Sequence, residues 1–168
     1  RSGWRSSLCT GPLSGARKGS DRGMLTLHHI GITTRNLRRL EAFYRDHFGA
    51  QVVRRGGWPG GQQGFDQCMG LHDSAVRIVL LRCGAAHLEL FEFTRPQTLP
   101  AAEAMVAREG LTHLAFQVSD CRAEYARLSA AGMRFNAPPL LTPVGAWFTY
   151  GHDPDGNIVE LIQPPPGD

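Results

Sequence analysis

Two stretches of this chain repeat the same order of hydrophobic and polar positions. Residues 27–33 (LHHIGIT) and 111–117 (LTHLAFQ) are short runs of apolar and β-branched residues, which are typical of β-strands. A run with apolar residues at helical spacing follows each of them, and we expect Gly49 and Gly132 to end the two helices. The apolar positions are Leu37, Leu40, Phe43, Tyr44 and Phe48 in the first helix, and Tyr125, Leu128 and Ala131 in the second. His29 precedes Gly49 by 20 residues and His113 precedes Gly132 by 19, so the two units share one spacing.

Each unit then ends in a pair of strands. SAVRIVLLR and AHLELFEF flank a turn at Gly84, and GAWFTYGH and GNIVELIQ flank the turn DPDG. The pattern predicts an α+β fold made of two strand–helix–strand–strand–strand (βαβββ) modules, at 25–94 and 110–164. Between them, the Ala-rich centre of 95–110 predicts a short helix. The Gly-rich segment 56–74 predicts a long loop with one helical turn near 65–69.

The repeat selects four residues that can ligate a metal ion. His29 aligns with His113, and Glu89 aligns with Glu160, whereas His28 aligns with Thr112. Because side chains alternate along a strand, His28 and His29 are expected on opposite faces, with His29 on the face of the site. A carboxylate among apolar strand residues needs a partner. One such residue alone is compatible with a structural role, but four at duplicated positions favour a site for one divalent ion, such as Zn, Ni, Co, Mn or Fe.

Composition and charge narrow the class of protein. The chain has 168 residues, 42% of them hydrophobic and 20% charged, and from Met24 onward the charges nearly balance. This predicts one domain at 24–168, no nucleic-acid surface and no membrane span. Residues 1–23 are rich in Gly, Ser and Arg and are expected to be a disordered extension, with a mitochondrial transit peptide as the alternative. The four cysteines show no C-x-x-C spacing, which favours a cytoplasmic setting.

Five segments together resemble the vicinal oxygen chelate superfamily, which includes glyoxalase I, methylmalonyl-CoA epimerase, extradiol dioxygenases and bleomycin-resistance proteins. They are HHIGITT, LEAFYRDHFG, HLELFEF, THLAFQV and DPDGNIVELIQP. The resemblance implies that the two modules form a curled mixed sheet around a metal cleft, commonly in a homodimer. It also implies that His29, Glu89, His113 and Glu160 are the ligands of that metal.

The resemblance further implies an enzyme that acts on a small oxygenated substrate. A glutamate at position 89 is similar to glyoxalase I and favours a metal-dependent lyase, isomerase or epimerase. The metal would chelate both oxygens of an enediolate, and Glu160 or Glu89 would move the proton. The alternatives are a non-catalytic protein that binds and sequesters a small molecule, or an extradiol-type dioxygenase. Arg54, Arg55, Arg77 and Arg82 could meet anionic groups of a substrate. The expected substrate-binding residues are Trp58, Phe65, Met69, Arg77, Trp147 and Tyr150.

Overall fold

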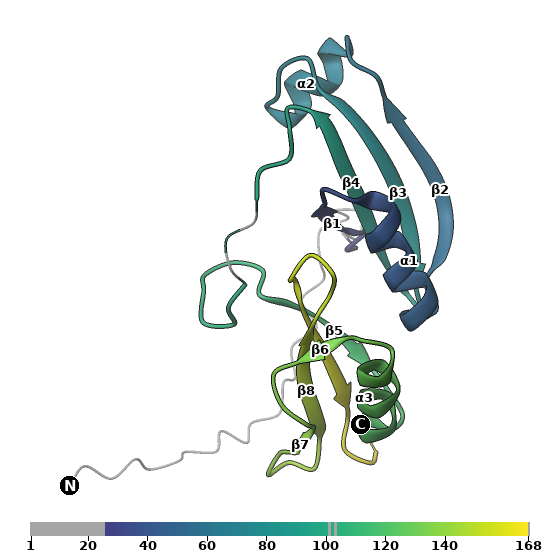
Figure 1. The fold of residues 1–168 in the computed structure, drawn as a ribbon, viewed down its shortest axis with the longest axis vertical. Coiled ribbons are helices and arrows are strands. Elements are labelled where there is room, and N and C mark those ends of the chain that lie inside the picture. Colours follow the sequence, from purple (N-terminus) through teal and green to yellow (C-terminus); the bar gives the residue numbers. More distant parts are fainter. Residues whose placement is uncertain (1–25, 101, 103, 168) are drawn as a thin grey trace, which may run out of the picture.

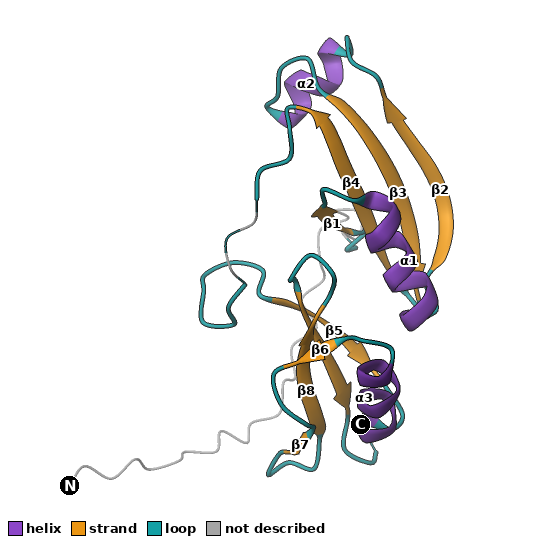
Figure 2. Ribbon diagram, in the orientation of Figure 1, coloured by secondary structure: helices purple, strands orange, loops and turns teal. Residues whose placement is uncertain are grey.

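The chain folds into two mixed sheets, each carrying one long helix. The structure is a computed structural model that describes residues 26–100, 102 and 104–167, so the predicted extension 1–23 lies outside the described residues. The first module contains β1 (Ile30–Thr33), α1 (Leu37–Phe48), β2 (Gln51–Trp58), α2 (Gln63–Met69), β3 (Ala75–Cys83) and β4 (Ala86–Arg95). The second contains β5 (His113–Gln117), α3 (Cys121–Ala130), β6 (Arg134–Phe135), β7 (Leu140–Leu141), β8 (Trp147–His152) and β9 (Ile158–Gln163). The two modules lie one above the other in Figure 1, and Figure 2 separates their helices from their strands.

Both sheets follow one topology, which confirms the predicted α+β fold. The strand order is β1-β4-β3-β2 in the first sheet and β5-β9-β8-β6 in the second, with β7 paired to β8. In each module the first strand pairs in parallel with the last, and the other neighbours are antiparallel. The parallel registers place Gly31 beside Glu89 and Ala115 beside Glu160. The two carboxylates therefore occupy equivalent places in the two sheets.

Local sequence signals set the limits of the two long helices. The Asn36 side chain accepts a hydrogen bond from the backbone N–H of Arg39 and caps α1, and Gly49 ends that helix in the left-handed conformation. Asp120 caps α3 in the same way, by accepting from the backbone N–H groups of Arg122 and Ala123. No helix within the described ranges is long and apolar enough to cross a membrane.

Each sheet has one face covered by its helix and one face that we call the open face. In β4, Leu88 and Leu90 are buried against α1, whereas Glu89 lies between them in sequence and points to the open face. In β9, Val159 and Leu161 belong to the core, and Glu160 points to the opposite side. The apolar partners of both strands are thus on the helix side, which leaves each glutamate on the open face.

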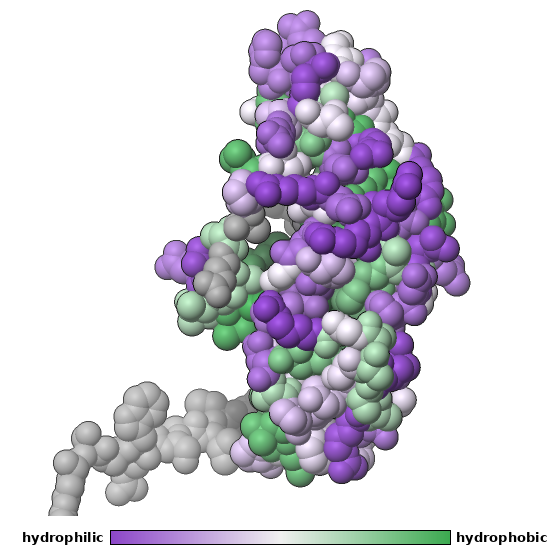
Figure 3. All heavy atoms as spheres, viewed as in Figure 1, coloured by the Kyte–Doolittle hydropathy of each residue, from purple (hydrophilic) through white to green (hydrophobic). Residues whose placement is uncertain are grey.

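The two modules share one core where their helix-covered faces meet. Aromatic rings of α1 contact Phe116 of β5, and the centroids of Phe48 and Phe116 are 4.5 Å apart. The buried Tyr44 hydroxyl donates a hydrogen bond of 2.9 Å to Asp153 in the turn between β8 and β9. Arg39 of α1 forms an ion pair with Asp155 of the same turn. In the space-filling view, hydrophilic residues gather over α1 and around α2 (Figure 3).

Two local predictions meet different outcomes. The helical turn expected near residues 65–69 is present as α2. The short helix expected in 95–110 is wrong for the described residues of that segment, which form turns and extended chain. Met105 and Val106 are exposed, so a helix here would bury no apolar face, and a short helix without such packing is marginal in water.

Tyr44→Phe tests the hydrogen bond between the modules. Burial and the neighbouring Asp153 carboxylate raise the pKa of Tyr44 well above its usual value. The variant removes one of the two donors to Asp153 Oδ2, which keeps its hydrogen bond from the Asn157 side chain, so we expect a loss of about 1 kcal/mol in the free energy of unfolding at pH 7. Because the folded state holds the Tyr44 proton, this tyrosine's contribution to stability is complete below the unfolded pKa, about 10. It is lost as the pH rises above that value, so the difference in the free energy of unfolding between the wild type and Tyr44→Phe should become smaller there.

Urea denaturation at pH 7 and above pH 10 measures this difference in the free energy of unfolding. Tyr125→Phe is the control, since this ring packs against Phe135 in the second module, and it should change stability by no more than about 0.5 kcal/mol. A Tyr44→Phe protein as stable as the wild type at pH 7 would contradict the role given to this bond.

Candidate metal centre

Glu89 lies beside His29 on the open face of the first sheet. The distance from His29 Nε2 to Glu89 Oε2 is 3.1 Å. Glu89 is 7% exposed, because β1 and β3 flank it and Leu80 is its cross-strand neighbour. The His29 side chain is 36% exposed. The pair therefore presents one nitrogen and one oxygen donor at the surface of the sheet.

Glu160 and His113 form the same arrangement in the second sheet. Here His113 Nε2 is 3.0 Å from Glu160 Oε2, and Glu160 is 8% exposed. Tyr150 is the cross-strand neighbour of Glu160, and its ring meets the His113 ring edge-on with centroids 5.3 Å apart. Burial and the negative charge of Glu160 raise the pKa of Tyr150.

The four predicted ligands thus form two pairs within one chain. Among the described residues, no group of three or more His, Cys, Asp or Glu side chains is placed to hold a metal ion. Each pair has the separation expected of two ligands of one ion: with bonds of about 2.0–2.2 Å, neighbouring donors lie about 3.0–3.5 Å apart. We call each pair a half-site, since it supplies two donors and a stable site needs more.

The strand register separates the four arginines that could meet an anionic group. Arg54 lies on the open face, and its Nη2 is 3.1 Å from Glu89 Oε1. Arg55 points to the helix side and binds Glu41 of α1. Arg77 also lies on the helix side, 2.7 Å from Glu92, and Arg82 donates to Gln51 near the end of the sheet. Arg54 is the one that touches a predicted ligand.

The predicted separation of His28 and His29 onto opposite faces is not observed. Their Nδ1 atoms are 2.7 Å apart and their rings meet edge-on, while His28 also stacks on His87. The reason is that regular pairing of β1 begins only at Ile30, so strand alternation does not govern these two residues. His29 remains the one that reaches Glu89.

The structure divides the predicted substrate-binding residues between the two faces. Tyr150 is on the open face, beside His113. Trp58 pairs with Val76, and its ring contacts the ring of Phe65. It lies about 13 Å along β2 from Arg54. Met69 ends α2 at the same end of the sheet as Trp58. Arg77 and Trp147 lie on the helix side, where Arg122 of α3 stacks over the Trp147 ring. Those two residues do not face the half-sites.

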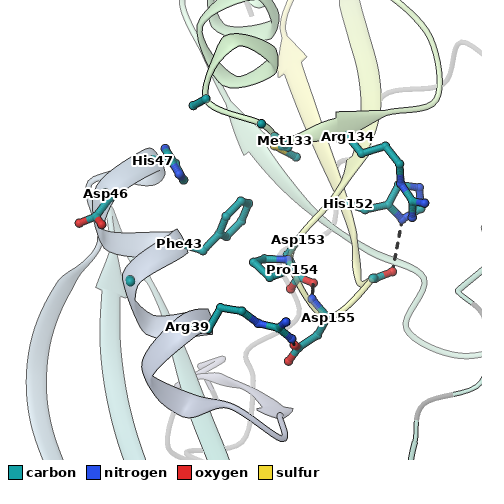
Figure 4. A pocket seen from close by; sticks show the side chains of 14 residues that line it. Arg39, Phe43, Asp46, His47, Met133, Arg134, His152, Asp153, Pro154 and Asp155 are labelled. Atoms are coloured by element: carbon teal, nitrogen blue, oxygen red, sulfur yellow. Dashed lines mark hydrogen bonds and ion pairs between the residues drawn. The ribbon is translucent and has the colours of Figure 1, made fainter.

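Two clefts lie at the junction of the modules rather than on the open faces. One, of about 740 Å³, runs between α1 and the turn that follows β8 (Figure 4). Arg39, His152 and Asp155 line both this cleft and a second one of about 780 Å³, which extends beneath 96–104. None of the four predicted ligands lines either cleft. The half-sites are therefore on open sheet surface.

Comparisons with known proteins match nearly the whole described chain. The family model described as Glyoxalase/Bleomycin resistance protein/Dioxygenase superfamily matches residues 26–161. "Uncharacterized protein YaeR" of Escherichia coli K12 is 29% identical over 147 residues, which are 84% of this chain and 98% of that protein. A glyoxalase family protein from Bacillus cereus has a TM-score of 0.76 at 19% identity, covering 86% of this chain and 97% of that one. The trypanothione-dependent glyoxalase I of Leishmania major has a TM-score of 0.61 at 22% identity, covering 83% and 87%.

Glu160→Gln tests the contact between the second half-site and Tyr150. Removing the negative charge should lower the Tyr150 pKa toward the ordinary tyrosine value, while burial keeps part of the shift. Ultraviolet titration of the tyrosines measures it, and Tyr150→Phe identifies the transition. Glu124→Gln removes a half-buried carboxylate of α3 that pairs with Arg127, and it should leave the Tyr150 titration unchanged. An unaltered Tyr150 titration in Glu160→Gln would contradict the geometry.

Proposed function

Because this chain belongs to the Glyoxalase/Bleomycin resistance protein/Dioxygenase superfamily, we propose that it is a metal-dependent lyase, isomerase or epimerase of the glyoxalase type. One observation carries the proposal. Equivalent strands of the two modules present the same His–Glu pair, with donor separations of 3.1 and 3.0 Å. A duplicated pair of donors at ligand spacing is the feature that such a reaction needs. The relatives that match structurally support the fold.

The chemistry of the four donors fits a borderline divalent ion. Two imidazole nitrogens and two carboxylate oxygens suit Zn, Ni, Co, Mn or Fe, whereas calcium prefers more oxygens. Both carboxylates are nearly buried, and an ionised carboxylate in such a place requires a compensating charge. His29 and Glu89 would hold the ion from one side, and His113 and Glu160 from the other.

A second copy of the chain would complete the site. The two half-sites of one chain do not form a single cluster within the described residues. Each lies on an open face where Gly31, Arg54, Ala115 and Gln117 are exposed. In a homodimer with twofold symmetry, the first half-site of one subunit could face the second half-site of its partner, which gives two equal sites.

The reaction moves one proton between neighbouring carbons of the substrate. A divalent ion bound at this site would polarise a carbonyl and make the adjacent C–H acidic. Glu160 or Glu89 would take that proton on a carboxylate oxygen, while the C–H electron pair forms a C=C bond and the π pair of the carbonyl moves onto its oxygen, which gives an enediolate. The same carboxyl group would return the proton to the neighbouring carbon. The two histidines would hold their positions throughout.

Activity and metal content should depend on the same residues. The protein is stripped with a chelator, reloaded with Zn, Ni, Co, Mn or Fe, and assayed on hemithioacetals, thioesters and 2-hydroxy acids. Glu160→Gln should lower kcat by about 100-fold or more if this carboxylate moves the proton. Tight, unchanged binding of these compounds without turnover would favour a sequestering protein. Uptake of oxygen with a catechol would favour an extradiol dioxygenase.

His29→Ala and His28→Ala should affect metal binding differently. His29 contacts Glu89 and is a proposed ligand, so its loss leaves three donors and should weaken metal affinity by a factor of about 100 or more. His28 is exposed and contacts the His29 and His87 rings, so its loss should cost at most about 1 kcal/mol of stability and leave metal content near the wild type. Metal analysis after dialysis measures both. Metal content that follows His28 instead would contradict the assignment.

A further inference from the structure

Arg54 distinguishes the two half-sites chemically. Its guanidinium contacts Glu89 at 3.1 Å, whereas Glu160 makes no ion pair with a lysine or arginine in the described part of the chain. The equivalent neighbourhood of Glu160 holds the ring of Tyr150 instead. The site therefore has a guanidinium on one side and an aromatic ring on the other.

A bulge in the edge strand aims Arg54 at the site. The register of β2 against β3 shifts between Val52 and Arg54, so Val53 has no partner and Arg54 lies opposite Leu80. Leu80 pairs in turn with Glu89, which puts Arg54 two strands from the carboxylate on the same face. Without the extra residue, Val53 would occupy that place and Arg54 would point to the helix side.

The guanidinium keeps most of its hydrogen-bonding capacity. The Arg54 side chain is 66% exposed, and within the described residues its hydrogen bond to Glu89 uses only Nη2. The other N–H groups of the planar fork point to no protein acceptor there, and such a fork matches the two oxygens of a carboxylate. Arg54 can thus hold Glu89 and a second anionic group together.

The charges around the site favour such a group. Glu89 and Glu160 contribute two negative charges, which a divalent ion would neutralise. The guanidinium of Arg54 then leaves one positive charge in excess beside the substrate. Resting on the proposed function, we infer that this site selects substrates that carry a carboxylate next to their two vicinal oxygens, and that Arg54 binds that carboxylate. Neutral substrates would leave the excess charge uncompensated.

Binding of two small chelators to the cobalt-loaded protein tests the inference. Hydroxypyruvate and hydroxyacetone share a keto and a hydroxyl oxygen on neighbouring carbons, but hydroxypyruvate carries a carboxylate next to them where hydroxyacetone has a methyl group. Visible absorption of bound Co(II) reports each dissociation constant without requiring turnover. Arg54→Gln should weaken the binding of hydroxypyruvate by about tenfold or more, as expected for one charge-assisted hydrogen bond. It should leave the binding of hydroxyacetone within about twofold and should not weaken Co(II) binding, because it removes a positive charge beside a proposed ligand, and Arg54→Lys should retain part of the preference.

Arg82→Gln is the matched control. Arg82 lies on the same open face and donates to Gln51, so the variant removes an equal charge without touching Glu89. It should bind both chelators as the wild type does. The inference is overturned if Arg54→Gln weakens the binding of both chelators equally, or of neither, or if the variant no longer binds Co(II). It is also overturned if Arg82→Gln weakens the binding of the anionic chelator as much as Arg54→Gln does. A wild-type protein that binds no Co(II) overturns the proposed function itself, and this inference with it.

Discussion

The burial of one carboxylate in each sheet is the constraint on which this structure depends. Glu89 and Glu160 are 7% and 8% exposed in strands whose neighbours belong to the core. Leaving such a charge without a partner costs several kcal/mol, so the chain must bring a compensating group to each. In each module a histidine at the start of the parallel first strand, or directly before it, contacts the carboxylate, and Arg54 adds a positive charge beside Glu89. The βαβββ topology matters because it places that first strand directly beside the last.

The way the modules meet follows from which face of each sheet is apolar. Their helix-covered faces share a core through α1, and the Tyr44–Asp153 and Arg39–Asp155 contacts hold α1 against the β8–β9 turn. The open faces, which carry the half-sites, take no part in that core. A chain built in this way is stabilised through one surface and keeps its two His–Glu pairs on another.

Much of the fold was predictable, because periodicity and turn chemistry are local signals. Asn36, Gly49 and the DPDG turn mark element boundaries directly in the sequence, and the repeat identified His29, Glu89, His113 and Glu160. The side of Arg54 was not predictable, since it depends on a bulge at Val53 that only strand pairing reveals. The sheet register likewise placed Arg77 and Trp147 on the helix side. His28 escaped the alternation rule because pairing begins one residue after His29.

Complementation between two variants that each lack one half-site tests directly whether the metal site is shared between two subunits. One carries His29→Ala with Glu89→Gln, the other His113→Ala with Glu160→Gln, and the two are mixed so that mixed dimers form. If the site is shared between subunits, each mixed dimer contains one site built from two intact half-sites and one built from two damaged half-sites. If the site is shared, neither variant alone holds Co(II), whereas the mixed dimer binds one ion per two chains. A mixed dimer without metal, beside a wild type that binds one ion per chain, would show that each site closes within a single chain.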